Sequence, residues 1–484
     1  MNPGWHALDR RAMPVAAVFM TGVAAAAGVP TAIGLSDISV AVALAWVLPG
    51  SAVIVGAGVV AEWLRLRVTR YRVGPERVEL HTGVLIRTRR SLQRDRIRTV
   101  DVTADPLLRV FGLVSVRIGT GEHADEGTVQ LRPVARATGD DLRRELLTRD
   151  VRDGGTLAVL DPGWIRYAPL SFVAPALGGA AIGATLNLAD WFGRADGVVG
   201  WAIDLLAGLG LVGAIVVVTA FLLVVGTIGA LGLWVEMWRG YRLEREPGGT
   251  LRVRRGLLTT RSISVEEDRL RGVDLVEPLG ARLAGAARID AVATGMATKS
   301  DKDKAHHRTL LPAAPRAVAD RVAADVLHEQ VGAVRLTPHP IAARGRRLRW
   351  ALTAVVVAEV PLIAFGWPWI ALITAIVAVP VAVALGLDAY RSLGHGTAGG
   401  YLVARSGSVR RSTVALQRRG IIGWTVRQSI FQRRAGLATV WATTAAGAGA
   451  YAIRDVGTST GLEAADAAVP GLLTPFLEKD IPRG

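Results

Sequence analysis

The chain of 484 residues contains no cysteine at all. This excludes a disulfide scaffold, an iron–sulfur cluster and a cysteine-ligated zinc site. Long stretches also lack charge, although the chain as a whole is 20% charged and 51% hydrophobic. A soluble protein mixes charged and apolar residues throughout its length. The uneven distribution disfavours disorder and a purely soluble enzyme, and it is typical of a multipass membrane protein with water-exposed domains.

Lysine is nearly missing as well. Four lysines leave 53 arginines among the 57 basic residues, against 41 acidic ones, for a formal net charge of +16. Such a chain attracts polyanions. Membrane tethering makes the anionic leaflet the nearest polyanion, so we expect a lipid surface rather than nucleic acid.

Five blocks are long enough to cross a bilayer, which requires about 20 predominantly apolar residues. They are 12–36, 38–61, 167–189, 205–235 and 350–387, the last interrupted by Glu359 and by a turn at Gly366. Because the last block has room for two short spans, we predict six spans in three hairpins, at 12–64, 165–238 and 348–388. A cleaved signal peptide is the alternative for the first span.

Arginines gather at the outer ends of the hairpins, whereas the three hairpin tips contain only Arg194. Positively charged segments tend to stay on the cytoplasmic side. This predicts a bacterial cytoplasmic (inner) membrane protein with both termini and all large inter-hairpin segments in the cytoplasm. The missing cysteine is compatible with that reducing compartment.

The segments between and after the hairpins are copies of one unit, which we place at 68–152, 239–331 and 398–480. Leu92-Gln93-Arg94 and the Arg-x-x-Gly-Leu-x-x-Val stretch from Arg109 recur 324 positions later at Leu416-Gln417-Arg418 and Arg433. The middle copy keeps the spacing of several positions, but Leu283-Ala284-Gly285 replaces the arginine-containing stretch. A repeat of hairpin plus soluble unit is expected.

Each unit begins with short runs rich in β-branched residues and separated by Gly or Pro, which is the pattern of antiparallel strands. The end of the unit changes to helical spacing, as at Val318, Val322 and Val326. The predicted class is therefore an α+β membrane protein. Six transmembrane helices alternate with three antiparallel β-sandwich or barrel domains, each capped by a C-terminal helix.

These repeated segments resemble the bacterial pleckstrin-homology-like, membrane-flanked domain proteins, in particular members with three domains. The resemblance covers essentially the whole chain, and the middle copy departs most from it. It implies a bent antiparallel sandwich capped by a helix, an inner-membrane location and no catalytic residues.

No catalytic constellation is visible, and no cofactor or metal is expected. His306 and His307 lie in a charged loop that makes a poor chelate. The dinucleotide-like pattern Gly208, Gly210 and Gly213 lies inside an uncharged block, where glycines more commonly permit close helix packing.

The remaining candidates are charged side chains. Arginines suit phosphate headgroups because the planar guanidinium binds them through two donors. The lipid- or partner-facing candidates are Arg87, Arg89, Arg90, Arg94, Arg96, Arg98, Arg418, Arg419, Arg433 and Arg434. Glu359 is an intramembrane polar candidate, because a charge at that depth is costly.

Two functions remain open. The leading hypothesis is a non-enzymatic membrane protein whose units dock or assemble a protein partner or anionic lipid, with oligomerisation allowed and envelope maintenance or defence as the setting. The alternative is a transporter or channel component with Glu359 in its pathway. A lipid-modifying enzyme is a third possibility that lacks visible catalytic residues.

Overall fold

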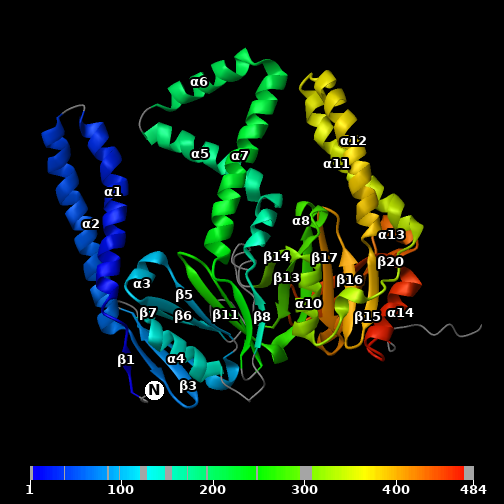
Figure 1. The fold of residues 1–484 in the computed structure, drawn as a ribbon, viewed down its shortest axis with the longest axis horizontal. Helices are drawn as coiled ribbons and strands as arrows, with labels where there is room; N and C mark the ends of the chain where they lie inside the picture. The colour runs from blue at the N-terminus through cyan, green and yellow to red at the C-terminus, as the bar shows by residue number, and fades with distance from the viewer. Residues whose placement is uncertain are drawn as a thin grey trace, which may run out of the picture. The chain divides into compact units, whose positions relative to one another are not determined.

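The computed structural model describes residues 4–36, 39–83, 87–97, 99–119, 128–147, 155–171, 173–191, 194–246, 249–294 and 308–473. The chain divides into two compact units, Met1–Glu266 and Glu267–Gly484 (Figure 1). All strand pairs within the described residues are antiparallel, and long apolar helices accompany them. The coarse α+β class is therefore confirmed.

The first unit contains two sheets. The four-stranded sheet has the order β1-β2-β3-β4, with β1 (His6–Ala7), β2 (Arg70–Val73), β3 (Arg77–Thr82) and β4 (Thr88–Gln93). The seven-stranded sheet has the order β7-β6-β5-β11-β10-β9-β8. Its strands are β5 (Thr99–Ala104), β6 (Leu113–Gly119), β7 (Thr128–Ala135), β8 (Gly155–Val159), β9 (Arg242–Glu246), β10 (Thr250–Arg255) and β11 (Thr260–Glu266).

The second unit also contains two sheets, with the orders β14-β13-β12-β17-β16-β15 and β18-β19-β20. The six-stranded sheet comprises β12 (Leu270–Pro278), β13 (Ala286–Ala293), β14 (Thr309–Pro315), β15 (Gly394–Ala398), β16 (Tyr401–Ser406) and β17 (Arg410–Gln417). The three-stranded sheet comprises β18 (Ile421–Arg427), β19 (Leu437–Thr444) and β20 (Ala450–Gly457).

Short and closing helices complete the soluble parts. The short helices are α3 (Pro106–Val110), α8 (Leu279–Leu283) and α13 (Ile430–Arg434), and the closing helices are α4 (Arg136–Leu147), α10 (Arg316–Leu327) and α14 (Thr458–Ala468). The closing helices approach their sheets closely. A Cβ at Gly139 would lie 2.6 Å from Val114, and one at Gly461 would lie 2.6 Å from Val456. Leu142 and Ala465 accordingly lie in the buried cores.

Two glycines in each copy set the same backbone geometry. Gly83, Gly256 and Gly407 have φ of 117°, 111° and 105°, and Gly112, Gly285 and Gly436, each 29 positions later, have φ of 69°, 70° and 64°. Non-glycine side chains rarely adopt these angles. The shared spacing gives an ungapped alignment of the three copies over this stretch.

That alignment corrects the interpretation of the middle copy. Arg109, Arg282 and Arg433 each occupy the fourth position of their short helix, α3, α8 and α13. The middle copy therefore retains the arginine, one residue before Leu283-Ala284-Gly285. The prediction that this segment replaces it was wrong, because only the neighbouring apolar residues differ.

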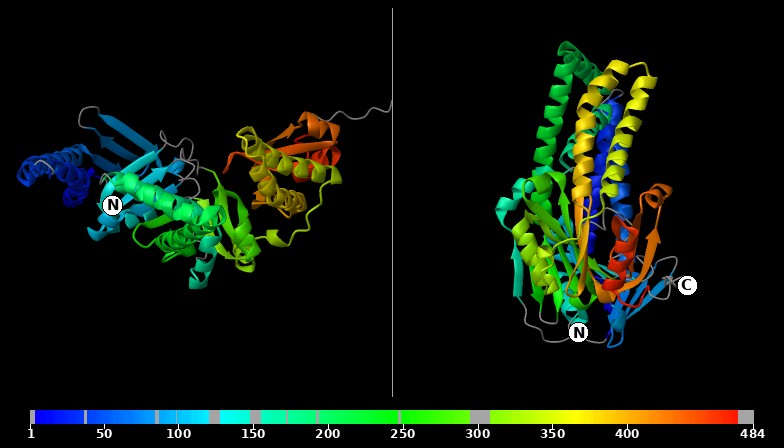
Figure 2. Two further views of the ribbon diagram at one scale, coloured as in Figure 1. Left: turned by 90° about the horizontal axis from the view of Figure 1, so that it is seen from above. Right: turned by 90° about the vertical axis from the view of Figure 1, so that its right-hand side faces the viewer.

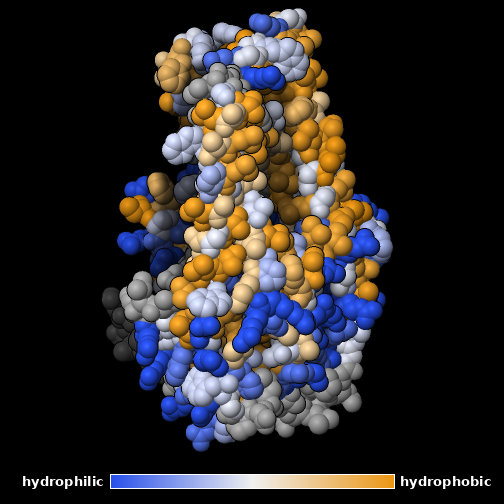
Figure 3. Space-filling view, turned by 90° about the vertical axis from the view of Figure 1, so that its left-hand side faces the viewer, coloured by the Kyte–Doolittle hydropathy of each residue, from blue (hydrophilic) through white to orange (hydrophobic). Residues whose placement is uncertain are grey.

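Within the described residues, four helices are long and apolar enough to cross a membrane, at Ala12–Ile33, Val40–Val68, Val212–Trp238 and Pro368–Arg391. They belong to α1 (Ala12–Ser36), α2 (Val40–Val68), α7 (Gly210–Trp238) and α12 (Pro368–Arg391). Figure 3, which views the chain from the side of α1 and α2, shows apolar side chains over the helices on this face and hydrophilic ones gathered at their base. The chain therefore has the character of a membrane protein.

The count of six spans stays a prediction. The pair formed by η2 (Pro162–Leu170) and α5 (Val173–Trp191) would make a fifth span, but it is bent by 69°. The helix α11 (Ile341–Ala364) has arginines in its first half and Glu359 near its end. It nevertheless lies alongside α12 as a hairpin (Figure 2).

The second hairpin is more elaborate than the sequence predicts. An additional helix, α6 (Ala195–Gly208), precedes α7, and the two are separated at Leu209, directly before Gly210, whose φ is 68°. The glycine pattern at 208–213 therefore marks a break rather than a tight packing face. Close packing occurs between α5 and α7, where a Cβ at Gly178 would lie 2.4 Å from Leu222 O and one at Gly226 would lie 2.0 Å from Ala174 O.

Neighbouring copies share sheets. In the first unit, β5 of the first copy pairs with β11 of the middle copy through Val102↔Ser262, Thr103↔Arg261 and Ala104↔Thr260. In the second unit, β12 of the middle copy pairs with β17 of the third copy, from Gly272↔Leu416 to Pro278↔Arg410. The fourth strand of one copy thus pairs each time with the third strand of the next.

Candidate functional site at the foot of the third hairpin

The predicted arginines fall into two groups. Arg94 and Arg418, which close the two Leu-Gln-Arg segments, have internal partners. Arg418 donates to Ala468 O at 2.5 Å and Ala467 O at 2.8 Å, at the end of α14. Arg94 likewise donates to Glu145 O near the end of α4, and its guanidinium lies 3.6 Å from the Glu145 carboxylate. These arginines hold the closing helices.

Six of the other candidates are exposed, and they lie on separate elements. Arg87, Arg89 and Arg90 lie at or on β4, and Arg419, Arg433 and Arg434 lie at or near η5 (Arg418–Gly420) and α13. The backbone of Arg96 lies in η1 (Arg94–Arg96), whereas Arg98 lies outside the described residues. The structure does not gather these residues into one site.

A different set of arginines lines a cavity of about 390 Å³ in the second unit, at the start of α11. We call this the basic pocket. Its lining consists of Arg346, Arg347, Trp350, Arg427, Gln432, Thr439, Trp441, Arg454 and Asp455. Four arginines against one aspartate leave three positive charges in excess. The volume is in the range of small-molecule sites.

Asp455 anchors the pocket. Its side chain is fully buried on β20, and it adopts the left-handed conformation with φ of 54°. One carboxylate oxygen lies 2.6 Å from Arg346 and the other lies 2.5 Å from Arg347, while Gln432 donates to the first at 2.8 Å. One carboxylate therefore holds two guanidinium groups side by side at the start of α11.

Gln432 is itself fixed from two sides. It forms a capping box with Ser429 at the start of α13, and it donates to Thr439 Oγ1 at 2.9 Å.

The arginines of the basic pocket differ in their surroundings. Burial lowers the pKa of Arg347, and the Asp455 carboxylate opposes this shift. Arg427 and Arg454 are exposed on the same pocket, so two arginines are held internally and two face outward.

A pair of buried histidines lies behind Asp455. His339 Nδ1 is 3.2 Å from Asp455 O, and His339 Nε2 is 3.0 Å from His395 Nδ1. Burial lowers the pKa of both imidazoles, and the neighbouring His339 lowers that of His395 further, to about 4. The pair is therefore neutral at physiological pH, and one ring nitrogen accepts a hydrogen bond from the other.

Sequence reasoning missed this pocket for a physical reason. The arginines from Arg344 to Arg349 served only as evidence for orientation, because nothing in their spacing indicates a common partner. Asp455 is more than a hundred residues away, and only the packing of β20 against the base of α11 brings it between Arg346 and Arg347. The only sequence signal for the pocket was the pair of tryptophans that flank it, Trp350 and Trp441.

Glu359 has a partner across its hairpin. Thr374 Oγ1 on α12 lies 3.0 Å and 2.9 Å from the two Glu359 carboxylate oxygens. Such a contact joins two apolar helices through a polar bond.

The described residues contain no group of three or more His, Asp or Glu side chains that could hold a metal ion.

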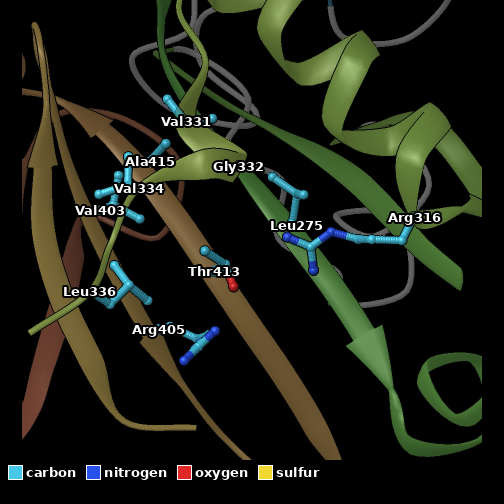
Figure 4. Close-up of a pocket in the computed structure, with 10 residues that line it drawn as sticks. All are labelled: Leu275, Arg316, Val331, Gly332, Val334, Leu336, Val403, Arg405, Thr413 and Ala415. Atoms are coloured by element: carbon cyan, nitrogen blue, oxygen red, sulfur yellow. The ribbon is translucent and has the colours of Figure 1, made fainter. Parts of the chain in front are cut away.

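A second cavity, of about 40 Å³, lies where β12 and β17 meet (Figure 4). Arg316 extends toward it from α10 and Arg405 borders it from β16, with Thr413 between them. Arg316 pairs with Glu277 at 2.9 Å. The cavity is large enough for water only, so we assign it to the packing of the shared sheet.

The comparisons with known proteins agree with the repeated architecture. No curated protein and no solved structure matches the chain. The family model described as "Bacterial PH domain" matches three times, at residues 21–149, 198–330 and 351–468. Each match begins within a helical segment and ends near the closing helix of a copy, and together they cover most of the chain. The protein therefore belongs to the bacterial PH domain family.

Proposed function

We propose that this protein is a non-enzymatic, multipass protein of the bacterial inner membrane whose cytoplasmic PH-like domains act as membrane-proximal docking and assembly modules. Bacterial PH domains are binding modules, and the apolar helices supply the membrane association. The basic pocket is the observation that carries the proposal. It would hold the phosphate of an anionic lipid headgroup against the protein.

The position of the pocket supports a lipid ligand. Arg346 and Arg347 begin the helix that leads into the third hairpin, and Trp350, which is 65% exposed, follows one turn later. Tryptophan favours the headgroup layer of a membrane. Basic residues at that depth each contribute roughly 1 kcal/mol of attraction to an anionic leaflet.

The difference between the two arginines paired with Asp455 and the two exposed arginines supports the same function. Asp455 neutralises part of the charge on Arg346 and Arg347 and fixes their positions. Arg427 and Arg454 are exposed, so their guanidinium groups remain accessible to a phosphate. Two donors on each planar group match two phosphate oxygens.

The test measures the melting temperature of the purified full chain in detergent with added phosphatidylglycerol or phosphatidylcholine. Phosphatidylglycerol should raise the melting temperature, because a ligand that binds the folded state stabilises it. In Arg427→Gln/Arg454→Gln, two lost contacts of roughly 1 kcal/mol each should weaken lipid binding about thirtyfold.

The matched control is Arg419→Gln/Arg434→Gln, which removes the same charge from exposed arginines outside the pocket. It should keep nearly the full response. Equal losses in both double variants would mean that net charge alone attracts the lipid, and would reject the pocket as a docking site.

A further inference from the structure

The two junctions between copies have the same register. The glycine alignment places Val102, Thr103 and Ala104 of the first copy at the positions of Leu275, Val276 and Glu277 of the middle copy. It likewise places Ser262, Arg261 and Thr260 at the positions of Thr413, Ser412 and Arg411 of the third. The observed pairs Leu275↔Thr413, Val276↔Ser412 and Glu277↔Arg411 are therefore the equivalents of the pairs in the first junction. One mode of joining is used twice.

A side-chain contact repeats as well. In the first junction, Arg109 of α3 donates to Leu257 O, in the turn before β11. In the second, Arg282 of α8 donates to Ser408 O at 3.2 Å, in the turn before β17. Leu257 and Ser408 each directly follow the equivalent glycines Gly256 and Gly407. Each junction thus combines a strand pair with an arginine that reaches the neighbouring turn.

One glycine marks the tightest contact of the second junction. A Cβ at Gly272 would lie 1.9 Å from Ala415 O on the paired strand, so the close approach of β12 and β17 excludes any side chain there. The third copy has Gly423 at the equivalent position of β18, yet a Cβ there would meet nothing within 4 Å. Within this chain, Gly423 has no steric reason to be glycine.

In the described part of the chain, no further copy pairs with the fourth strand of the third copy. Its fourth strand, β18, is the outer strand of its sheet, and Ile422 and Val426 on it are 64% and 41% exposed. Arg433, the equivalent of Arg109 and Arg282, is exposed on α13. The first copy presents the receiving side, because its third strand, β4, is the outer strand of the four-stranded sheet.

We propose that β18 of one chain pairs with β4 of a second copy of this chain, in the register of the two internal junctions. This inference rests on the assembly role proposed above and names its partner. The expected pairs are Val426↔Arg89, Arg427↔Thr88 and Gln428↔Arg87, with Gly423 facing Leu92. No arginine lies directly opposite another in this register.

The contact is head-to-tail, since the two surfaces differ. Such contacts generate closed rings or open arrays rather than isolated symmetric dimers. Strand addition of this kind supplies backbone hydrogen bonds along the outer strand of a sheet.

Paired cysteines test the register, because the natural chain has no cysteine to interfere. Chains carrying Thr88→Cys and chains carrying Arg427→Cys, with different affinity tags, are co-expressed and oxidised in native membranes. Paired antiparallel residues have Cα atoms about 4.5–5.5 Å apart, within the range that a disulfide spans. A covalent dimer containing both tags is expected.

Two controls calibrate the experiment. Thr103→Cys/Arg261→Cys, at the equivalent positions of the first internal junction, should form a disulfide within one chain. Thr88→Cys chains with Arg419→Cys chains, the latter exposed but outside β18, should yield at least tenfold less dimer. No mixed dimer despite the internal disulfide, equal yield from the Arg419→Cys pair, or dimers of Arg427→Cys chains alone would each overturn the proposal.

Gly423→Val provides an independent measurement. The side chain fits the isolated chain, so the melting temperature should be unchanged, whereas in the assembly it would collide with the carbonyl of Ser91 in the second copy. Native mass spectrometry should show at least a tenfold loss of oligomer, while Thr425→Val on the same strand retains it. Oligomers that survive Gly423→Val contradict the inference. If lipid stabilisation through the basic pocket persists in that case, the proposed function stands without it.

Discussion

A single buried carboxylate determines the shape of the basic pocket. Asp455 receives Arg346, Arg347 and Gln432 while its backbone is held in the left-handed region. Aspartate and asparagine tolerate that region better than most residues. The chemistry and the backbone geometry at this position therefore select the same small set of side chains.

Asp455→Asn should destabilise the second unit while preserving its backbone. The amide can still adopt the left-handed conformation, but it leaves two half-buried guanidinium groups without their counter-charge. Removing one partner of a buried ion pair costs about 3 kcal/mol, which corresponds to a melting temperature about 6 to 12 °C lower. Thermal unfolding in detergent measures it, with the exposed Glu463→Gln as the matched change. Equal melting temperatures for the two variants would contradict this role.

The histidine pair predicts a pH dependence of stability. The folded state keeps the pKa of His395 at about 4, whereas an unfolded histidine has its ordinary value near 6.5. The unfolded state therefore binds more protons between these values, so stability is complete above pH 6.5 and is lost as the pH falls toward 4. The melting temperature of the wild type should fall over this window more steeply than that of His395→Gln.

The comparison with His81→Gln isolates the effect, because that substitution removes an imidazole from the other unit. His81→Gln should follow the wild type. A His395→Gln profile parallel to that of the wild type would show that the loss of stability in acid arises elsewhere.

At the scale of elements, the arginine of the Leu-Gln-Arg segment has a structural task. Arg418 donates hydrogen bonds to the carbonyl groups left free at the end of α14, and Arg94 does the same for α4. The middle copy lacks this arginine, and the carboxylate at its position cannot donate to a carbonyl oxygen. Glu267 stands at that position and lies 4.0 Å from His328, the residue that ends α10 in the left-handed conformation.

Arg418→Ala should loosen α14 without altering the rest of the third copy. Hydrogen bonds from a charged donor contribute about 2 kcal/mol net, so amide hydrogen exchange in 458–468 should accelerate about thirtyfold. Arg419→Ala, the exposed neighbour, should leave exchange within a factor of about two. Unchanged protection in Arg418→Ala would show that apolar packing alone holds the helix.

At the scale of the whole molecule, the apolar helices raise the question of transport. Glu359 is bonded to Thr374 on the adjacent helix, and an amide can replace it in that bond. Glu359→Gln should therefore leave protein level and cell phenotype unchanged. Glu359→Leu, which cannot bond, should weaken the hairpin by about 0.6 kcal/mol. A phenotype lost in Glu359→Gln at normal protein level would instead favour the transporter hypothesis.

Much of this architecture is predictable from the sequence. Apolar blocks, β-branched runs and the repeat at Leu92 and Leu416 locate helices, strands and copies, because these patterns reflect local burial and periodicity. Contacts between distant segments are not local. Asp455 with Arg347, or Thr103 with Arg261, depends on how the sheets join. The exposed arginines look alike in sequence, and only the structure separates Arg418, which holds a helix, from Arg427, which faces the pocket.

The pairing of strands between neighbouring copies also affects how such chains can change length in evolution. Removing the middle copy would leave β5 of the first copy and β17 of the third, whose register matches that of both existing junctions. A shortened chain could therefore close without an unmatched interior strand, and a duplicated copy could be inserted in the same way. Gain or loss of a whole hairpin and its domain would leave the two outer edges, β4 and β18, unaltered, so copy number can vary while the contact between chains is preserved.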